Sequence, residues 1–206
     1  MEKGPIYKSI DYILSGLVYI NLVELFKFLS QKLSSKTASL TNKRRNLRIS
    51  VDLFILIKWI FIGLLVFSNK AYPITTIIAW YLIFTNLYTY FFYHTWSTDI
   101  LKDKFFDIDR IKRRFLNLFL AIFFTIFTFA YLYFVPYSNE FYWESSATFL
   151  HSFWYSVSNS LTASYSQVFP LSDLGNSISM IQLLIMFLFL TIIIGGSVPQ
   201  IPQSKE

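Results

Sequence analysis

Residues 160–175, SLTASYSQVFPLSDLG, decide what kind of fold this chain has. The stretch combines hydroxyl side chains, a tyrosine and a proline, yet it lies between two long apolar segments near the C-terminus. In a membrane protein, such a stretch is either a short exposed loop or a segment that dips back into the bilayer. Non-helical backbone at membrane depth is tolerated only where it is buried in protein or lines water. The choice between the two alternatives therefore bears on both fold and function.

The composition of the whole chain is that of a membrane protein. Of its 206 residues, 54% are hydrophobic, 20% are aromatic and only 15% are charged, whereas a soluble domain carries about 25% charged residues. The chain has no cysteine, which excludes disulfides, thiolate metal sites and cysteine catalysis. In a membrane protein, a formal net charge of +6 indicates topology and binding to anionic lipid before it indicates binding to nucleic acid.

Four apolar segments each come near the ~20 residues that a helix needs to cross the bilayer. They are residues 51–68, 73–93, 115–135 and 178–195. Lys58, the one lysine in the first segment, is expected to snorkel toward the membrane surface. An earlier segment, residues 10–29, is interrupted by polar and charged side chains. It predicts an amphipathic helix on the membrane surface, with a fifth span as the alternative. The sequence thus predicts an all-α integral membrane protein with four transmembrane helices.

Basic residues set the expected orientation. They cluster in residues 32–48 and 97–114, and residues 115–204 contain none. Short basic loops stay in the cytoplasm, so both clusters and both termini are expected inside the cell. The segment 136–176 is then outside, and its charged residues are all acidic. They are Glu140, Glu144 and Asp173.

This topology divides the chain into five parts and predicts a multi-pass protein of the inner (plasma) membrane. The parts are a basic cytoplasmic or interfacial N-terminal region (1–50), a first transmembrane hairpin (51–96), a basic cytoplasmic linker (97–114), a pore-like module of span, half-helix, loop and span (115–196), and a cytoplasmic tail (197–206).

Residues 147–162, ATFLHSFWYSVSNSLT, predict a short helix just before the polar loop. They are apolar enough for a helix but too few to cross the bilayer. A half-helix, an extended turn and a returning span are typical of a re-entrant loop. Without a gap, residues 149–176 resemble the pore module of the two-transmembrane potassium-channel family, whose pattern is commonly written FWDALYFSFVTLTTVGYGDIYPVTPLGK. The resemblance implies a re-entrant pore loop between the third and fourth spans.

In this register the polar loop resembles the selectivity filter of that family. Thr162 and Tyr165 match the filter threonine and tyrosine, whereas Ser164 and Ser166 stand where the family has glycines. Glycine takes left-handed backbone conformations without steric cost and serine does not. The resemblance therefore implies a degenerate filter that is not selective for potassium. The filter-like residues are Thr162, Ala163, Ser164, Tyr165, Ser166 and Gln167.

The last apolar segment is expected to be an inner helix that lines the axis of a homo-oligomer, and the resemblance favours a tetramer. Gln182, Met186, Phe189 and Ile193 follow each other at spacings of four, three and four, which puts them on one helical face. On that face Gln182 would form a polar ring, and Phe189 and Ile193 would form a hydrophobic constriction that excludes water.

Two further features flank this helix. Gly195 and Gly196, at its inner end, are interpreted either as a helix C-terminus before Pro199 or as a hinge at the inner mouth. At the outer mouth, the three acidic residues Glu140, Glu144 and Asp173 would concentrate cations.

The sequence thus predicts an ion-channel-like oligomeric membrane protein with a degenerate filter. The alternative is a non-conducting sensor or anchor subunit of a multiprotein bacterial complex, such as an anti-phage defence system. In that case the basic N-terminal region would dock a cytoplasmic protein partner.

No enzyme, metal site or cofactor is expected. His94 and His151 fall on opposite sides of the membrane in this topology and cannot share a metal. No nucleophile with its base and acid can be assigned beside His151. The expected partners are the bilayer, anionic lipid at the basic segments and further copies of the chain, rather than nucleic acid.

Overall fold

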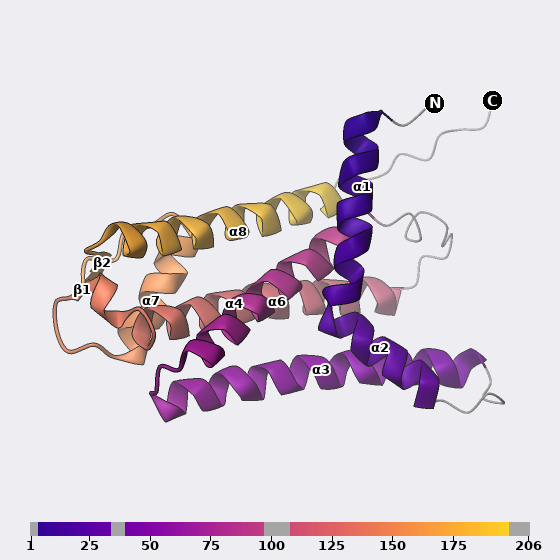
Figure 1. Ribbon diagram of the computed structural model, residues 1–206, viewed down its shortest axis with the longest axis horizontal. Coiled ribbons are helices and arrows are strands. Elements are labelled where there is room, and N and C mark those ends of the chain that lie inside the picture. Colours follow the sequence, from indigo (N-terminus) through magenta and orange to yellow (C-terminus); the bar gives the residue numbers. More distant parts are fainter. Residues whose placement is uncertain (1–3, 34–39, 97–107, 198–206) are drawn as a thin grey trace. The chain divides into compact units, whose positions relative to one another are not determined.

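The computed structural model describes residues 4–33, 40–96 and 108–197 (Figure 1). The described residues are almost all helical, and 4 of the helices are long and apolar enough to cross a membrane. The prediction of a helical fold with four helices long and apolar enough to span is therefore confirmed, and these helices are consistent with a multi-pass membrane protein. The chain divides into two compact units, Met1–Gly63 and Leu64–Glu206, and each is described by itself.

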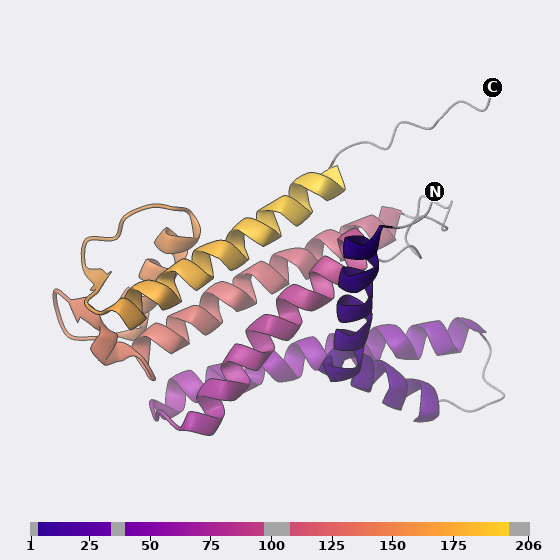
Figure 2. The ribbon, with the colours of Figure 1, turned by 45° about the horizontal axis from the view of Figure 1, so that its top comes forward.

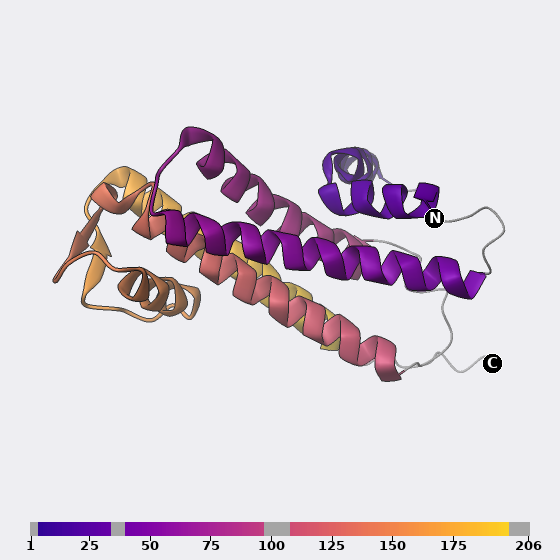
Figure 3. The same ribbon diagram turned by 90° about the horizontal axis from the view of Figure 1, so that it is seen from below.

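The N-terminal unit begins with two short helices that meet at a sharp bend. Helix α1 (Pro5–Leu17) continues as a 3-10 turn, η1 (Val18–Ile20), and α2 (Leu22–Leu33) follows. The bend lies at Asn21, whose backbone is extended and whose Oδ1 accepts a hydrogen bond from the N–H of Val23 at 3.0 Å. This side-chain cap starts α2 in a new direction, and the two helices diverge by 61° (Figure 3). The single helix expected over residues 10–29 is thus broken in two.

Helix α3 (Leu40–Ser68) contains the first candidate span, Arg45–Ser68. Helix α2 packs against the first turns of that span. The Phe26 ring lies 5.2 Å from the Phe54 ring, and the Ser50 hydroxyl donates to the Phe26 carbonyl oxygen at 3.1 Å. These contacts hold α2 beside the end of α3 that carries the basic residues.

The second unit holds three further candidate spans, whose helices run side by side (Figure 2). They are α4 (Pro73–Phe91), α6 (Ile108–Phe134) and α8 (Asp173–Ser197). Helix α4 continues as a π-helical turn, η2 (Phe92–Trp96). Proline at the start of α4 suits a helix, because the first N–H groups have no partner within the helix in any case.

Polar side chains fasten α4 to α6. The Asn86 Nδ2 donates to the Ala121 carbonyl oxygen at 2.9 Å and to the Thr125 Oγ1 at 3.1 Å. The Tyr90 hydroxyl donates to the Asn117 carbonyl oxygen at 2.7 Å. Hydrogen bonds between membrane helices contribute about 0.6–2 kcal/mol each. They also fix how far one helix is shifted along the other.

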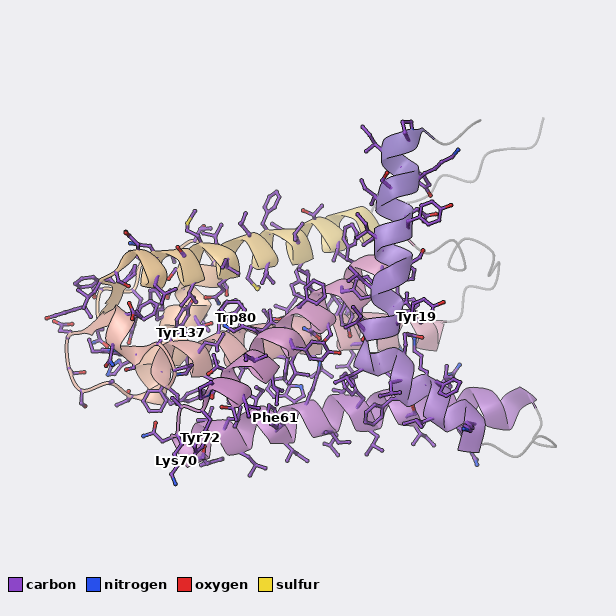
Figure 4. The ribbon with its side chains drawn as sticks, in the orientation of Figure 1. Tyr19, Phe61, Lys70, Tyr72, Trp80 and Tyr137 are labelled. Carbon is purple, nitrogen blue, oxygen red and sulfur yellow. The ribbon has the colours of Figure 1, made fainter. Side chains whose placement is uncertain are left out.

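An irregular segment joins the C-terminal end of α6 to the N-terminal end of α8. It contains η3 (Ser138–Glu140), β1 (Phe141–Trp143), α7 (Phe149–Ser160) and β2 (Val168–Pro170). The two strands pair antiparallel, with Phe141 opposite Pro170, and so draw the two ends of the segment together. Trp80 of α4 donates from its Nε1 to the Tyr137 hydroxyl at 3.2 Å (Figure 4). The sequence predicted α7 but not the strands.

The boundary of the fourth span differs from the expected one. Helix α8 begins at Asp173 rather than at residue 178. Ser172 explains the early start, because its Oγ accepts a hydrogen bond from the N–H of Gly175 at 3.0 Å and so caps the helix. Most of the predicted linker (97–114) and tail (197–206), namely residues 97–107 and 198–206, lies outside the described residues.

Candidate functional site

Helix α7 reaches from the C-terminal end of α6 back toward its middle. At the start of α7, the Phe149 ring lies 5.0 Å from the Phe127 ring and 6.1 Å from the Phe134 ring. One turn later, the Phe153 ring lies 6.1 Å from the Phe123 ring. The contacts therefore move back along the third candidate span as α7 advances. Figure 3 shows α7 nearly end-on while α6 and α8 run across the view, so α7 crosses them obliquely.

The second half of α7 is fastened to the middle of α8. The Tyr155 hydroxyl lies 2.9 Å from the Ser179 Oγ. The Asn159 Nδ2 donates to the Ser179 carbonyl oxygen at 2.9 Å and to the Gln182 Oε1 at 3.0 Å. Gln182 is near the centre of the candidate span Asp173–Ile192. The end of α7 thus lies level with the middle of a spanning helix.

The polarity of α7 is inverted. Its buried residues include Ser152 and Ser156, both 0% exposed, whereas its outward side carries Leu150, Trp154 and, just after the helix, Leu161, which are 60%, 48% and 71% exposed. A helix at a water-covered surface has the opposite distribution. The arrangement suits a helix whose outward side meets an apolar medium or another protein chain.

Gln182 is the centre of a buried polar cluster, called here the Gln182 network, whose other members are Tyr133, Ser156, Asn159 and Ser160. Its Nε2 donates to the Ser156 Oγ at 2.7 Å and to the Ser160 Oγ at 2.9 Å. Its Oε1 accepts from the Tyr133 hydroxyl at 2.6 Å and from the Asn159 Nδ2 at 3.0 Å. One side chain therefore joins α6, α7 and α8.

This finding corrects the predicted axis-facing side of α8. Gln182 and Phe189 are both 0% exposed within a single chain. Phe189 lies in a cluster with Ala121 and Ile192, and its ring is 6.3 Å from the Tyr90 ring. The shared helical face is real, but it points toward α4, α6 and α7 instead of toward a neighbouring copy. A polar ring at Gln182 and a constriction at Phe189 are therefore incompatible with this packing.

The other predicted residues of α8 have separate outcomes. Met186 is half-buried against the same cluster as Phe189, and the side chain of Ile193 lies outside the described residues. Helix α8 continues through Gly195 and Gly196 to Ser197, the last residue that the structure describes, so their interpretation as a helix C-terminus stays a prediction. The hinge stays a prediction.

Lys58 also differs from expectation. Its side chain is buried, with 6% exposed, so it does not reach out to a membrane surface as a snorkelling lysine would. The side chain of His94 lies outside the described residues.

Helix α7 ends in a Schellman motif. The N–H of Ala163 donates to the Ser158 carbonyl oxygen at 2.8 Å, and the N–H of Thr162 donates to the Asn159 carbonyl oxygen at 3.1 Å. Thr162 takes a left-handed conformation with φ of 57°, where helices usually place glycine. A β-branched residue is an uncommon and strained choice there. A left-handed residue thus exists in the filter-like segment, and it is the threonine.

The filter-like residues beyond Thr162 run back toward β2. Thr162, Ala163, Ser164 and Ser166 are exposed, and Tyr165 and Gln167 are half-buried. Within the part of the chain that the structure describes, the N–H groups of Ser164 and Ser166 form no hydrogen bond. The structure therefore brings the six filter-like residues together in one exposed turn that is rich in unpaired polar groups.

The half-buried residues of this turn are held near the first turn of α7. The Tyr165 hydroxyl donates to the Gln167 Oε1 at 2.7 Å and lies 2.9 Å from the Nδ1 of His151, in the first turn of α7. The Nε2 of His151 lies 3.2 Å from the Ser145 Oγ. Sequence reasoning missed these contacts because they join three segments that are separated along the chain.

The three acidic residues predicted for the outer mouth differ in their surroundings. The Glu140 carboxylate accepts a hydrogen bond from the Ser172 hydroxyl, and its backbone oxygen accepts from the N–H of Leu171 at 2.8 Å. Glu140 thus stabilises the start of α8, where a negative charge is favourable. Gly175 lets it approach, because a Cβ there would lie 2.5 Å from the Glu140 carbonyl oxygen. Glu144 and Asp173 are exposed.

Comparisons with known proteins add no relative: no family model, no curated protein and no solved structure matches the chain. Among the described residues, no group of three or more histidine, aspartate or glutamate side chains could hold a metal ion.

Proposed function

We propose that the chain is a subunit of an ion-channel-like oligomeric membrane protein in which α7 and residues 161–167 form a re-entrant hairpin. The inverted polarity of α7 carries the proposal. Ser152 and Ser156 are turned inward and Leu150, Trp154 and Leu161 outward, which stabilises a helix in apolar surroundings and not in water.

The depth of α7 supports the same proposal. A helix of 12 residues is about 18 Å long, whereas the hydrocarbon layer is about 30 Å thick. Helix α7 is therefore too short to cross, yet its end is bonded to Gln182 at the middle of the fourth candidate span. A helix that starts at the outer end and stops halfway has to turn back.

The turn after α7 supports an oligomer. At this depth, lipid offers no hydrogen-bond partner to the exposed serine hydroxyls or to the unpaired N–H groups of Ser164 and Ser166. Further copies of the chain around an axis, with water between them, would provide partners for all of these groups. The resemblance to the potassium-channel pore module favours four copies. The exposed Glu144 and Asp173 would then surround the outer entrance and attract cations.

The basic residues and the N-terminal unit complete the proposed topology. Both termini lie in the cytoplasm, in an inner (plasma) membrane, because the basic clusters flank the spans on that side. Helix α1 has no buried residue, and Ile6, Ile10 and Ile13 on its apolar side are exposed. Together with the 61° bend, this favours a helix on the anionic membrane surface over a fifth span.

Ion flux through liposomes that contain only the purified chain tests the proposal. Because the chain has no cysteine, Ser164→Cys introduces a single thiol in the loop that would surround the proposed water-filled axis. We expect cation flux that an impermeant thiol reagent, added from the outer side, blocks in Ser164→Cys. In the matched control Asn139→Cys, an exposed outer residue of η3, the same reagent should leave the flux unchanged.

The alternative function gives a different result. A sensor or anchor subunit would show no flux and would co-purify with a stoichiometric soluble protein. Equal block of both cysteine variants would place the path, if there is one, away from the loop.

A further inference from the structure

The side chains of Ser145 and His151 meet at the start of α7. The Ser145 Oγ lies 3.2 Å from the His151 Nε2, and the His151 Nδ1 lies 2.9 Å from the Tyr165 hydroxyl. The Tyr165 hydroxyl in turn donates to the Gln167 Oε1 at 2.7 Å. Four side chains from three segments of the chain therefore form one series of hydrogen bonds, and this series begins at a serine.

The hydrogen positions in this series follow from the donors and acceptors that are present. The Tyr165 hydroxyl gives its one hydrogen to the amide oxygen of Gln167, so its oxygen accepts from the Nδ1 of His151. A neutral imidazole with its hydrogen on Nδ1 has a lone pair on Nε2. The Ser145 hydroxyl faces this lone pair and donates to it. Ser145 is therefore bonded to a base whose tautomer a third side chain fixes, which is the arrangement of an activated nucleophile.

The backbone holds both partners in place. The N–H of Glu144, the residue before Ser145, donates to the Gln167 carbonyl oxygen at 3.0 Å and extends the pairing of β1 with β2 by one residue. The N–H of His151 donates to the Thr148 Oγ1 at 3.3 Å, which caps α7. Ser145 is exposed, whereas His151 is half-buried. A reagent in water can thus reach the hydroxyl while the imidazole stays fixed to the protein.

The start of α7 also suits the negative charge that develops on an attacked carbonyl oxygen. The N–H groups of Phe149 and Leu150, in the same turn as His151, form no hydrogen bond with another described residue. Free N–H groups and the dipole at the N-terminus of a helix stabilise an oxyanion. The first turn of α7 therefore carries a base and two free donors beside an exposed serine.

We infer that Ser145 is a nucleophile with His151 as its general base, and that the pair takes the acyl group of a carboxylic ester. The Ser145 oxygen bonds to the carbonyl carbon as its hydrogen passes to the His151 Nε2. The ester C–O bond then breaks, and the leaving alcohol takes up this hydrogen. Water, which gives a proton to the same imidazole, attacks the acyl-serine. The carboxylic acid is released, and the proton returns to the Ser145 oxygen.

This activity goes beyond the proposed function and does not depend on conduction. It also goes beyond the expectation from the sequence, which assigns no enzyme. Ser145 and His151 lie six residues apart, on opposite sides of the first residue of α7, and Tyr165 follows 14 residues after His151. Only the folded chain brings the three side chains together.

Labelling of the full chain in lipid nanodiscs with a fluorophosphonate tests the inference. This reagent phosphonylates activated serine hydroxyls, and the chain has no cysteine that could compete. We expect a single phosphonyl group, located on Ser145 by peptide mass spectrometry. With p-nitrophenyl acetate we expect a burst of about one p-nitrophenolate per chain and then slower turnover, which is the kinetic sign of an acyl-enzyme.

Two substitutions separate a base from a mere contact. His151→Gln keeps a polar side chain that can accept from the Ser145 hydroxyl but cannot take its proton. The rate of labelling should therefore fall by about 10²–10⁴-fold, which is the usual contribution of a general base. Ser146→Ala is the matched control, because it removes the neighbouring exposed serine, and it should be labelled at the rate of the natural chain.

Tyr165 is a positioning residue, and the nitrogen chemical shifts of the imidazole test its role. The chain has two histidines, so His94→Gln leaves His151 as the only one. In this background the shifts should show the hydrogen on Nδ1. Adding Tyr165→Phe should move part of the population to the other tautomer and slow the labelling.

Each outcome decides the matter. No labelling, labelling at another residue, or an equal rate in His151→Gln would overturn the inference. If His151→Gln does not fold, Ser145→Ala serves instead, because it truncates an exposed side chain. It should lose both the label and the burst, and an unchanged burst would also overturn the inference. A labelled chain without ion flux would leave the nucleophile standing and count against the proposed function.

Discussion

Helix α7 and the loop that follows it are neighbours in the sequence, but they differ in whether their polar groups find hydrogen-bond partners within the chain. In α7 the buried polar groups find partners inside the chain: the Ser152 hydroxyl donates to the Phe149 carbonyl oxygen at 2.7 Å, and the Ser156 hydroxyl donates to the Ile126 carbonyl oxygen at 2.8 Å. In the loop, Ser164 and Ser166 are exposed and their N–H groups form no bond among the described residues.

The difference separates the polar groups that find hydrogen-bond partners within one chain from those that do not. The Gln182 network positions α7 without help, so the half-helix is a scaffold of the subunit. If the loop lies at membrane depth, as proposed, lipid cannot satisfy the groups that it leaves unpaired. The loop is therefore where another molecule, either water or a second copy, has to contribute.

Among the substitutions that test this comparison, Gln182→Leu should change the free energy of unfolding most. Leucine fills a similar volume but removes the acceptor of the Tyr133 hydroxyl and one of the two partners of Asn159 and of Ser160, at a site that is 0% exposed. We expect the free energy of unfolding to fall by about 3 kcal/mol, since each buried polar group left unpaired costs about 1–3 kcal/mol. Thermal unfolding in detergent measures it.

Met180→Leu is the matched control, because Met180 lies on the opposite, exposed side of α8 and makes no such bonds. It should unfold like the natural chain. Equal stability of the Gln182→Leu variant would show that α7 is not held by this network.

A smaller effect is expected from Leu161→Ser, at the tip of the hairpin. If the outward side of α7 meets an apolar medium, exchanging this 71% exposed leucine for serine should destabilise the chain by about 2 kcal/mol in bicelles. Leu171→Ser is the control, since Leu171 is similarly exposed, at 61%, but follows β2 at the outer side. Equal and negligible effects at both positions would mean that the tip of the hairpin lies in water.

The spans could be predicted because lipid demands long apolar helices, but their buried sides could not. Phe187 and Phe189 of α8 illustrate the limit, since the first is 61% exposed and the second 0%. In water, exposure would have selected against the first. In lipid both faces of a helix are apolar, so hydrophobic spacing does not tell the inside from the outside. For this reason the spacing predicts a shared face of α8 but not the direction in which that face points.

The candidate site was predictable in part. Its position, the short helix and the exposed turn follow from the pattern of residues 147–175. Ser152, Ser156 and Asn159 are spaced by four and three residues, which puts them on one helical face. This spacing is the signal in the sequence for the buried polar side of α7. The pairing of β1 with β2 and the hydrogen bonds of His151 with Ser145 and Tyr165 join distant segments, which no local pattern records.

The smallest effect, and one of opposite sign, is expected from Thr162→Gly at the boundary between the two regions. Thr162 holds φ of 57°, a conformation that glycine adopts without strain. The substitution should raise the free energy of unfolding by about 1 kcal/mol, visible as a higher melting temperature. Thr162→Ala keeps a Cβ in the left-handed region and should not stabilise the chain. Asn69→Gly, at the other left-handed non-glycine residue that the structure describes, with φ of 46°, should gain less, because asparagine tolerates this region better than threonine. A destabilised Thr162→Gly would mean that α7 does not end in a Schellman motif in the membrane, and the scaffold would then extend into the loop.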